Sequence, residues 1–155
     1  MERATEKNAI HAPVVALDLG EKRVGVAVSD ALSISISRLD ALPRTNWKQL
    51  LRDVENVVRR FDAQTVVIGL PLRLNGSSGD SALKVRAVAK KFAQSLKVPV
   101  YLQDERLTSF AAEQNLRTQG HKDDQLSALV DSEAAAVILR DFLSGGQDRM
   151  LVRTS

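Results

Sequence analysis

The first regular hydrophobic pattern in the chain is a pair of apolar runs joined by a short polar connection. The first covers residues 14–17 and leads directly into Asp18, and the second covers residues 24–28. Such a pair predicts a β-hairpin, and the alternation around Ile34 and Ile36 predicts a third strand. An ionised carboxylate in an apolar strand is costly unless a cation or several donors compensate it. Asp18 is therefore expected to have a partner, and a divalent metal ion is the first candidate.

The pattern after this hairpin alternates between helical and strand periodicity. Apolar residues at three- and four-residue spacing predict helices, and short apolar runs predict strands buried on both faces. A hairpin region followed by this alternation predicts an α/β fold in which a mixed sheet is covered by helices on both faces. The expected elements are a helix over 46–61, a strand over 65–69, a helix capped by Asp80, a strand over 99–102, and helices over 108–119 and 127–143 that flank a polar loop at 120–124.

Composition limits the classes of protein to which the chain can belong. It has 155 residues, 44% of them hydrophobic and 26% charged, which is typical of one soluble globular domain. We expect this domain over 13–144, with flexible tails at 1–12 and 145–155. The chain has no cysteine, which excludes thiolate metal sites and favours a cytoplasmic location. Neither a secretory signal nor a membrane span is predicted, and the formal charge of +3 does not by itself indicate nucleic-acid binding.

Three acidic sites, far apart in the sequence, are expected to converge. Asp104 and Glu105 follow the last predicted strand, and Asp131 lies early in the last predicted helix. Chemistry in such folds gathers at the carboxyl ends of parallel strands. Together with Asp18, these carboxylates offer the oxygen ligands that Mg²⁺ prefers, and two such ions can hydrolyse a phosphodiester.

Each acidic site also has a simpler interpretation. Asp18 can accept hydrogen bonds in its own turn or pair with Lys22 or Arg23. The acidic pair at 104–105 and Asp131 can instead lie at helix starts, where negative charge offsets the helix dipole. The metal-site hypothesis depends on the conjunction of the three sites.

Four blocks of the sequence, in order, resemble those of the YqgF/RuvX family, and the resemblance covers residues 14–143. It implies an RNase H-like fold with strand order 3-2-1-4-5, and a bacterial cytoplasmic nuclease that uses Mg²⁺ or Mn²⁺. The implied activity is processing of the 5′ end of pre-16S ribosomal RNA, with Holliday junction resolution as the alternative. The implied catalytic and metal-binding residues are Asp18, Glu105 and Asp131, with Asp104 as an alternative ligand. The blocks are VALDLGEKRVGVAVSD at 15–30, VIGLPL at 67–72, DERLT at 104–108 and VDSEAAA at 130–136.

The position of the second carboxylate departs from the related resolvases. In those proteins it follows the fourth strand, whereas here the fourth strand ends in Gly69-Leu70-Pro71 and the acidic pair follows the fifth. In the order 3-2-1-4-5 the fifth strand lies two places from the first, roughly 10 Å away. The site is therefore expected to be wider or rearranged, with the longer Glu105 favoured over Asp104.

Several polar residues are candidates for contacts to the substrate. The candidates on predicted helices can instead belong to a solvent-exposed charged face that binds no ligand. Phosphate contacts of this kind position a nucleic acid without reading its sequence. His121 is a further candidate for proton transfer, with simple exposure as its alternative. The substrate-binding candidates are Arg23, Arg73, Asn75, Lys84, Lys91 and Arg106.

Two other classes of protein compete with a nuclease. The hairpin around Asp18 also resembles the phosphate-binding hairpin of actin-like ATPases and sugar kinases, but those need a second domain, for which 155 residues leave no room. A binding protein that uses the same scaffold on RNA or in a transcription complex without cutting is the other rival. Structured RNA and branched DNA both stay open as partners. Cutting a junction symmetrically calls for a two-fold dimer, whereas an RNA-processing enzyme can act as a monomer.

Overall fold

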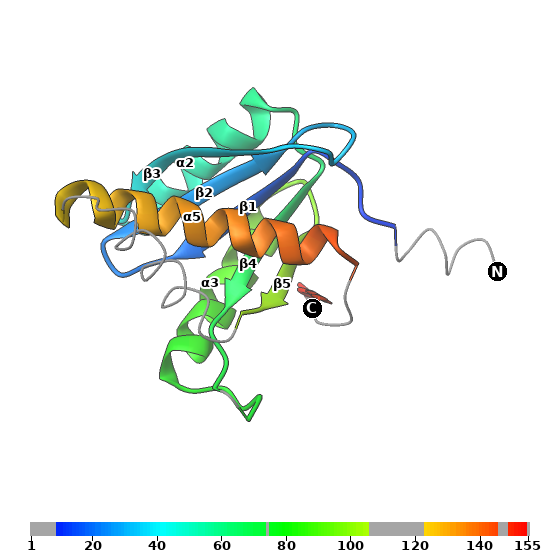
Figure 1. Ribbon diagram of the computed structural model, residues 1–155. Coiled ribbons are helices and arrows are strands. Elements are labelled where there is room, and N and C mark those ends of the chain that lie inside the picture. The colour runs from blue at the N-terminus through cyan, green and yellow to red at the C-terminus, as the bar shows by residue number, and fades with distance from the viewer. Residues whose placement is uncertain (1–8, 74, 106–122, 146–148, 155) are drawn as a thin grey trace.

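A six-stranded sheet forms the centre of the molecule, and helices cover both of its faces (Figure 1). The computed structural model describes residues 9–73, 75–105, 123–145 and 149–154, and the side chains of the last helix from residue 132 onward. The elements are β1 (Val14–Leu19), β2 (Arg23–Ser29), β3 (Ile36–Pro43), α2 (Trp47–Arg60), β4 (Thr65–Leu70), α3 (Asp80–Ser95), β5 (Val100–Asp104), α5 (Asp123–Leu143) and β6 (Arg149–Leu151).

The strand order is β3-β2-β1-β4-β5-β6, which confirms the predicted order 3-2-1-4-5 and extends it by one strand. β1 pairs antiparallel with β2 and parallel with β4, and β4 pairs parallel with β5. The prediction of five strands is wrong, because β6 pairs antiparallel with β5. Residues 149–151 lie in the segment predicted as a flexible tail. The carboxyl ends of β1, β4 and β5 meet at one edge of the sheet.

Two apolar cores, one on each face, hold the helices to the sheet, as the uninterrupted apolar strands predict. α2 and α3 share one face, and α5 crosses the other (Figure 1). No helix within the described ranges is long and apolar enough to cross a membrane. The core under α2 and α3 includes Leu17, Leu50, Val54, Ile68, Leu70, Phe92 and Leu102. The core under α5 includes Val14, Ala16, Ala27, Val67, Ala135, Ile138 and Phe142.

Two helices start at residues other than those predicted. The helix predicted over 46–61 is confirmed, and the Asn46 carboxamide oxygen accepts a hydrogen bond of 2.9 Å from the backbone N–H of Gln49. The cap of α3 is Gly79 rather than Asp80, which is the first helical residue. α5 begins at Asp123, four residues earlier than predicted. The predicted helix at 108–119 and loop residues 120–122 lie outside the described residues.

The hairpin that joins β2 to β3 is held by backbone hydrogen bonds and by the carboxylate of Asp30. Asp30 accepts hydrogen bonds from the backbone N–H of Ile34 at 2.8 Å and from the hydroxyl of Ser35 at 3.2 Å. The bond from Ile34 contributes most to lowering the pKa of the Asp30 carboxyl below its ordinary value. Asp30 thus has a structural role, at the opposite edge of the sheet from Asp18.

Candidate active site

Asp18 lies on the face of the sheet that α5 covers. Val14 and Ala16 belong to the core under α5, and side chains alternate along a strand, so Asp18 shares their face. Its partner on β2 is Gly25, and continuing the β1–β4 register by one residue aligns it with Gly69. The partly buried carboxylate is therefore flanked by a glycine on each neighbouring strand. Neither neighbour places a side chain in the space beside it.

Glu105 shares this face with Asp18, and Gly69 lies between them. The backbone N–H of Glu105 donates to the carbonyl of Leu70 at 3.0 Å, so strand pairing continues past the end of β5. A methyl group placed on Gly69 would lie 3.7 Å from Cγ of Glu105 and 2.9 Å from Cγ1 of Ile138 on α5. Glu105 is only 8% exposed. Glu105 thus lies beside Gly69 of β4, the strand that separates it from β1, and Ile138 packs over that glycine.

Asp104 lies on the opposite face of the sheet. Its register partner Leu70 and its neighbour Leu102 both belong to the core under α2 and α3. Alternation therefore directs Asp104 toward that core and Glu105 toward α5. Of the two candidate ligands at the end of β5, only Glu105 is on the same face as Asp18.

Asp131 is the ninth residue of α5, although the sequence predicts it near the helix start. Stabilisation of a carboxylate by the helix dipole falls off within the first turn, so this simpler explanation does not apply at position 131. The helical repeat places position 131 in line with Ala135 and Ile138, both of which are buried against the sheet. The side chain of Asp131 itself lies outside the described part of the chain.

The two residues after Asp131 attach α5 to the edge strand β3. The hydroxyl of Ser132 donates to the carbonyl of Leu39 at 2.7 Å, and Nε of Arg38 lies 2.6 Å from Oε2 of Glu133. Leu39 borders a β-bulge that lies opposite Gly25, the partner of Asp18. These contacts fix the distance between the sheet and the helical turn that follows position 131, and the rotation of that turn about the helix axis.

Replacing Ser132 with alanine tests this attachment. Ser132→Ala is expected to lower the free energy of unfolding by about 1 kcal/mol, because a partly buried hydrogen bond is lost. Urea unfolding measures the change. Ser144→Ala is a matched control, because that hydroxyl also donates to a backbone carbonyl at 2.7 Å but does so at the exposed end of the same helix. The control is expected to change stability by less than about 0.5 kcal/mol. Equal losses in the two variants would contradict a role for Ser132 in holding the helix.

Gly69 brings α5 close to the sheet, which gives a second prediction. Gly69→Ala is expected to cost about 1–3 kcal/mol of folding free energy, since the new methyl group would overlap Cδ1 of Ile138. Ile138→Val removes that carbon and is expected to restore part of the loss in the double variant. A double-mutant cycle by urea unfolding measures the coupling. Additive losses of folding free energy would show that contact with Ile138 is not the reason why alanine is unfavourable at position 69.

Among the predicted substrate contacts, Arg23 shares the face of Asp18, because it is two residues from Gly25 on β2. Arg73 lies in the loop after β4, where its Nε is 3.1 Å from a methyl group placed on Gly79. The carboxamide oxygen of Asn75 accepts hydrogen bonds from the backbone N–H and the hydroxyl of Ser77, so it orders the loop.

The other predicted contacts do not gather around the carboxylates. Lys84 and Lys91 are exposed on α3, which covers the face opposite to Asp18. Nζ of Lys91 lies 5.4 Å from the centre of the Trp47 ring. Arg106 and His121 lie outside the described residues.

The donor set on the α5 face suits a hard divalent cation. Among residues with described side chains, no group of three or more His, Cys, Asp or Glu is close enough to hold a metal ion. Mg²⁺ usually takes one or two carboxylates together with waters and substrate phosphate oxygens. Asp18 and Glu105 supply two carboxylates on one face, and Gly69, over which the side chain of Ile138 packs, lies between them in the sheet. The residues present therefore fit Mg²⁺ or Mn²⁺.

Three residues of this site were missed in the sequence. Gly69 carries no reactive group, and a single serine in a predicted helix gives no signal, so a search for candidate ligands passes over both. A glycine within a buried apolar run is a signal of close backbone approach and would have been enough to single out Gly69. Gln103 was also missed; it is 3% exposed, pairs in register with Gly69, and its carboxamide oxygen has no hydrogen-bond donor within the described chain.

Solved structures share the fold at low sequence identity. RuvC of Thermus thermophilus in complex with a Holliday junction substrate aligns with a TM-score of 0.53 and 19% identity, covering 91% of this chain and 99% of that one. Another T. thermophilus RuvC structure aligns with a TM-score of 0.52 and 15% identity, covering 90% and 99%. These similarities confirm the RNase H-like, RuvC-type fold predicted from the sequence.

Sequence relatives are similar over most of their length. A protein of Anaeromyxobacter sp. (strain Fw109-5) named "Putative pre-16S rRNA nuclease" is 41% identical over 129 residues, which are 83% of this chain and 94% of that protein. A protein of Chloroflexus aurantiacus with the same name is 38% identical over 130 residues, covering 84% and 85%. The model of the RuvX family, described as Holliday junction resolvase, matches residues 12–145. This protein therefore belongs to the RuvX family.

Proposed function

We propose that this protein is a divalent-metal-dependent endonuclease of the cytoplasm that processes the 5′ end of pre-16S ribosomal RNA. The observation that carries the proposal is the placement of Asp18 and Glu105 on one face of the sheet, with Gly69 between them. The names of the relatives support RNA as the substrate.

The proposed chemistry is hydrolysis of a phosphodiester. A pair of Mg²⁺ or Mn²⁺ ions, when bound, would activate a water and stabilise the leaving oxygen. Asp18 is the proposed central ligand, and Glu105 and Asp131 complete the donor set. Arg23, on the same face, is placed to balance the charge of the scissile phosphate. α5 excludes water from the side of the site where Ile138 packs on Gly69.

Metal binding can be tested apart from cleavage. Mn²⁺ is expected to raise the melting temperature of the wild-type protein, by an amount that grows with the logarithm of its concentration above the dissociation constant, and this shift should be lost in Asp18→Asn. Cleavage of a labelled precursor RNA should stop with chelator and return when Mg²⁺ or Mn²⁺ is added. Full cleavage in chelator would contradict metal dependence.

Resolution of a Holliday junction is the second candidate. The description of the matching family model favours it. A resolvase needs two active sites related by a two-fold axis, so it predicts a dimer on junction DNA. Sedimentation of the protein with a four-way junction distinguishes this candidate from a monomeric RNA-processing enzyme.

A further inference from the structure

The net positive charge of this chain is concentrated on the face of the sheet opposite to Asp18. α2, α3 and the turn after α3 carry nine Lys and Arg but only three acids, Asp53, Glu55 and Asp80. The remaining residues hold 13 of the 22 Lys and Arg and 16 of the 19 Asp and Glu, so the rest of the chain is net acidic. All nine cations are exposed. They are Lys48, Arg52, Arg59, Arg60, Lys84, Arg86, Lys90, Lys91 and Lys97. We call this surface the α2–α3 face.

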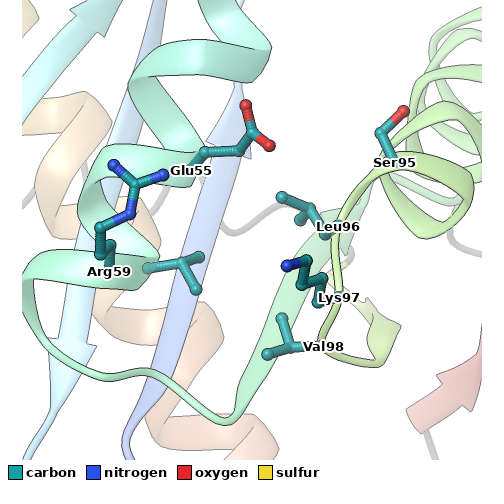
Figure 2. Close-up of a pocket in the computed structure, with 7 residues that line it drawn as sticks. Glu55, Arg59, Ser95, Leu96, Lys97 and Val98 are labelled. Atoms are coloured by element: carbon teal, nitrogen blue, oxygen red, sulfur yellow. The ribbon is translucent and has the colours of Figure 1, made fainter.

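The two helices of the α2–α3 face form one continuous surface. The rings of Trp47 and Phe92 lie 4.8 Å apart, and this contact joins α2 to α3. Between the helices is a groove of about 240 Å³, which has Arg59 on one side and Lys97 on the other (Figure 2). Val58, Leu96 and Val98 also line this groove.

The charge of this surface is not neutralised from within. In the part of the chain that the structure describes, none of the nine cations forms an ion pair with a carboxylate. Glu55 lines the same groove, but the residues about one helical turn before and after it, Arg52 and Arg59, are both cationic. A surface of this kind attracts a polyanion through its phosphates without reading sequence.

The surface also begins at the edge where the carboxylates lie. α3 starts directly after the loop that leaves the carboxyl end of β4, and Figure 1 shows this loop and the first turns of α3 extending beyond the ends of β4 and β5. From there the 16 residues of α3 run for about 24 Å toward the opposite edge. Lys84 and Arg86 lie near its start, and Lys97 follows its end.

We propose that the α2–α3 face binds the phosphate backbone of structured RNA that flanks the cleaved bond, so that the substrate bends around the edge of the sheet. This inference rests on the proposed function and adds a second contact region to it. The scissile bond is on the α5 face, and the flanking duplex lies along α3. Cations of the α2–α3 face set affinity for long substrates, and short substrates do not reach them.

The test measures RNA binding in the Asp18→Asn background, which is expected not to cleave. The probes are a short RNA hairpin and the same hairpin extended by one helical turn of duplex. The variant pair is Lys90→Glu with Lys97→Glu, and the matched control is Arg140→Glu with Arg153→Glu, whose residues are also exposed but lie outside the α2–α3 face. Both pairs change the formal net charge from +3 to −1, so a general charge effect is the same in each.

The first pair is expected to weaken binding of the extended RNA about tenfold at ~0.1 M salt and to make the slope of log K against log salt shallower by about two. The short hairpin and the control pair should change by less than about twofold. Equal losses on both RNAs, or equal losses in both pairs, would overturn the inference. It would also be overturned if the first pair abolished binding to anionic lipid vesicles and left RNA binding intact. If the protein with its wild-type surface bound neither RNA, the proposed function itself would fail.

Discussion

Asp18→Asn is expected to abolish cleavage, with a loss of at least about a thousandfold in the single-turnover rate. Removing an outer-shell partner of a metal ligand typically costs about 10–100-fold, and loss of the central carboxylate should cost more. The substitution preserves shape, and the two flanking positions, Gly25 and Gly69, offer no side chain to compensate the lost charge.

The same substitution is expected to leave the melting temperature unchanged or higher. Asp18 is partly buried and shares its face of the sheet with a second carboxylate, Glu105, so a neutral asparagine lowers the like charge on this face. Asp141→Asn is the control, because it makes the same change at a partly buried position far along α5. Cleavage at the wild-type rate in Asp18→Asn, or equal losses in both variants, would exclude Asp18 as the central ligand.

The second large effect distinguishes two adjacent carboxylates. Glu105→Gln is expected to lower the cleavage rate at least about a hundredfold, whereas Asp104→Asn should retain activity within about tenfold. The two variants are expected to differ because the side chains lie on opposite faces of the sheet. Glu105 lies on the α5 face beside Gly69, and Asp104 lies on the face of α2 and α3. Single-turnover cleavage at saturating Mg²⁺ measures both variants.

A titration of Mg²⁺ provides the control for this comparison. A metal ligand should shift the concentration of Mg²⁺ that gives half the maximal rate, so Glu105→Gln should require more metal and Asp104→Asn should not. The reverse pattern, with Asp104→Asn as the severe variant, would assign the ligand to the other face of the sheet. Unchanged cleavage rates in both variants would exclude Asp104 and Glu105, at the end of β5, from the site.

Most of the fold follows from hydrophobic periodicity. The uninterrupted apolar runs of β1 and β4 predict central strands with both faces covered, and the structure confirms this. β6 was missed because three residues, Arg149–Leu151, are too short to show a period. The start of α5 was missed because Asp123 and Asp124 were assigned to a polar loop, although acidic residues also favour the first turn of a helix.

The site was predictable in part. Asp18 is identifiable because a lone carboxylate in an apolar strand requires compensation. The choice between Asp104 and Glu105 depends on strand pairing that continues past β5, through the hydrogen bond from Glu105 to Leu70, and sequence does not reveal where pairing stops. Gly69 lies between Asp18 and Glu105, and its place in a buried apolar run indicates a close approach without showing that the approaching side chain is Ile138.

The cationic residues predicted to contact the substrate lie on two different faces of the sheet, and this too depends on the tertiary structure. Arg23 belongs to the face of Asp18, and Lys84 and Lys91 belong to the opposite one. Helical spacing shows that a lysine is exposed, but only the crossing of the chain from β4 to α3 decides which side of the sheet it occupies.

The most direct test of the central claim is a competition within one reaction. Wild-type protein and Mg²⁺ are mixed with equal amounts of a labelled RNA that spans the 5′ end of 16S ribosomal RNA and a labelled four-way DNA junction, and single-turnover rates are measured for both. The account predicts metal-dependent cutting of the RNA at a defined position, much faster than cutting of the junction, and loss of this activity in Asp18→Asn. Faster cutting of the junction would assign the site to DNA resolution, and binding of both substrates without cutting of either would contradict a catalytic role.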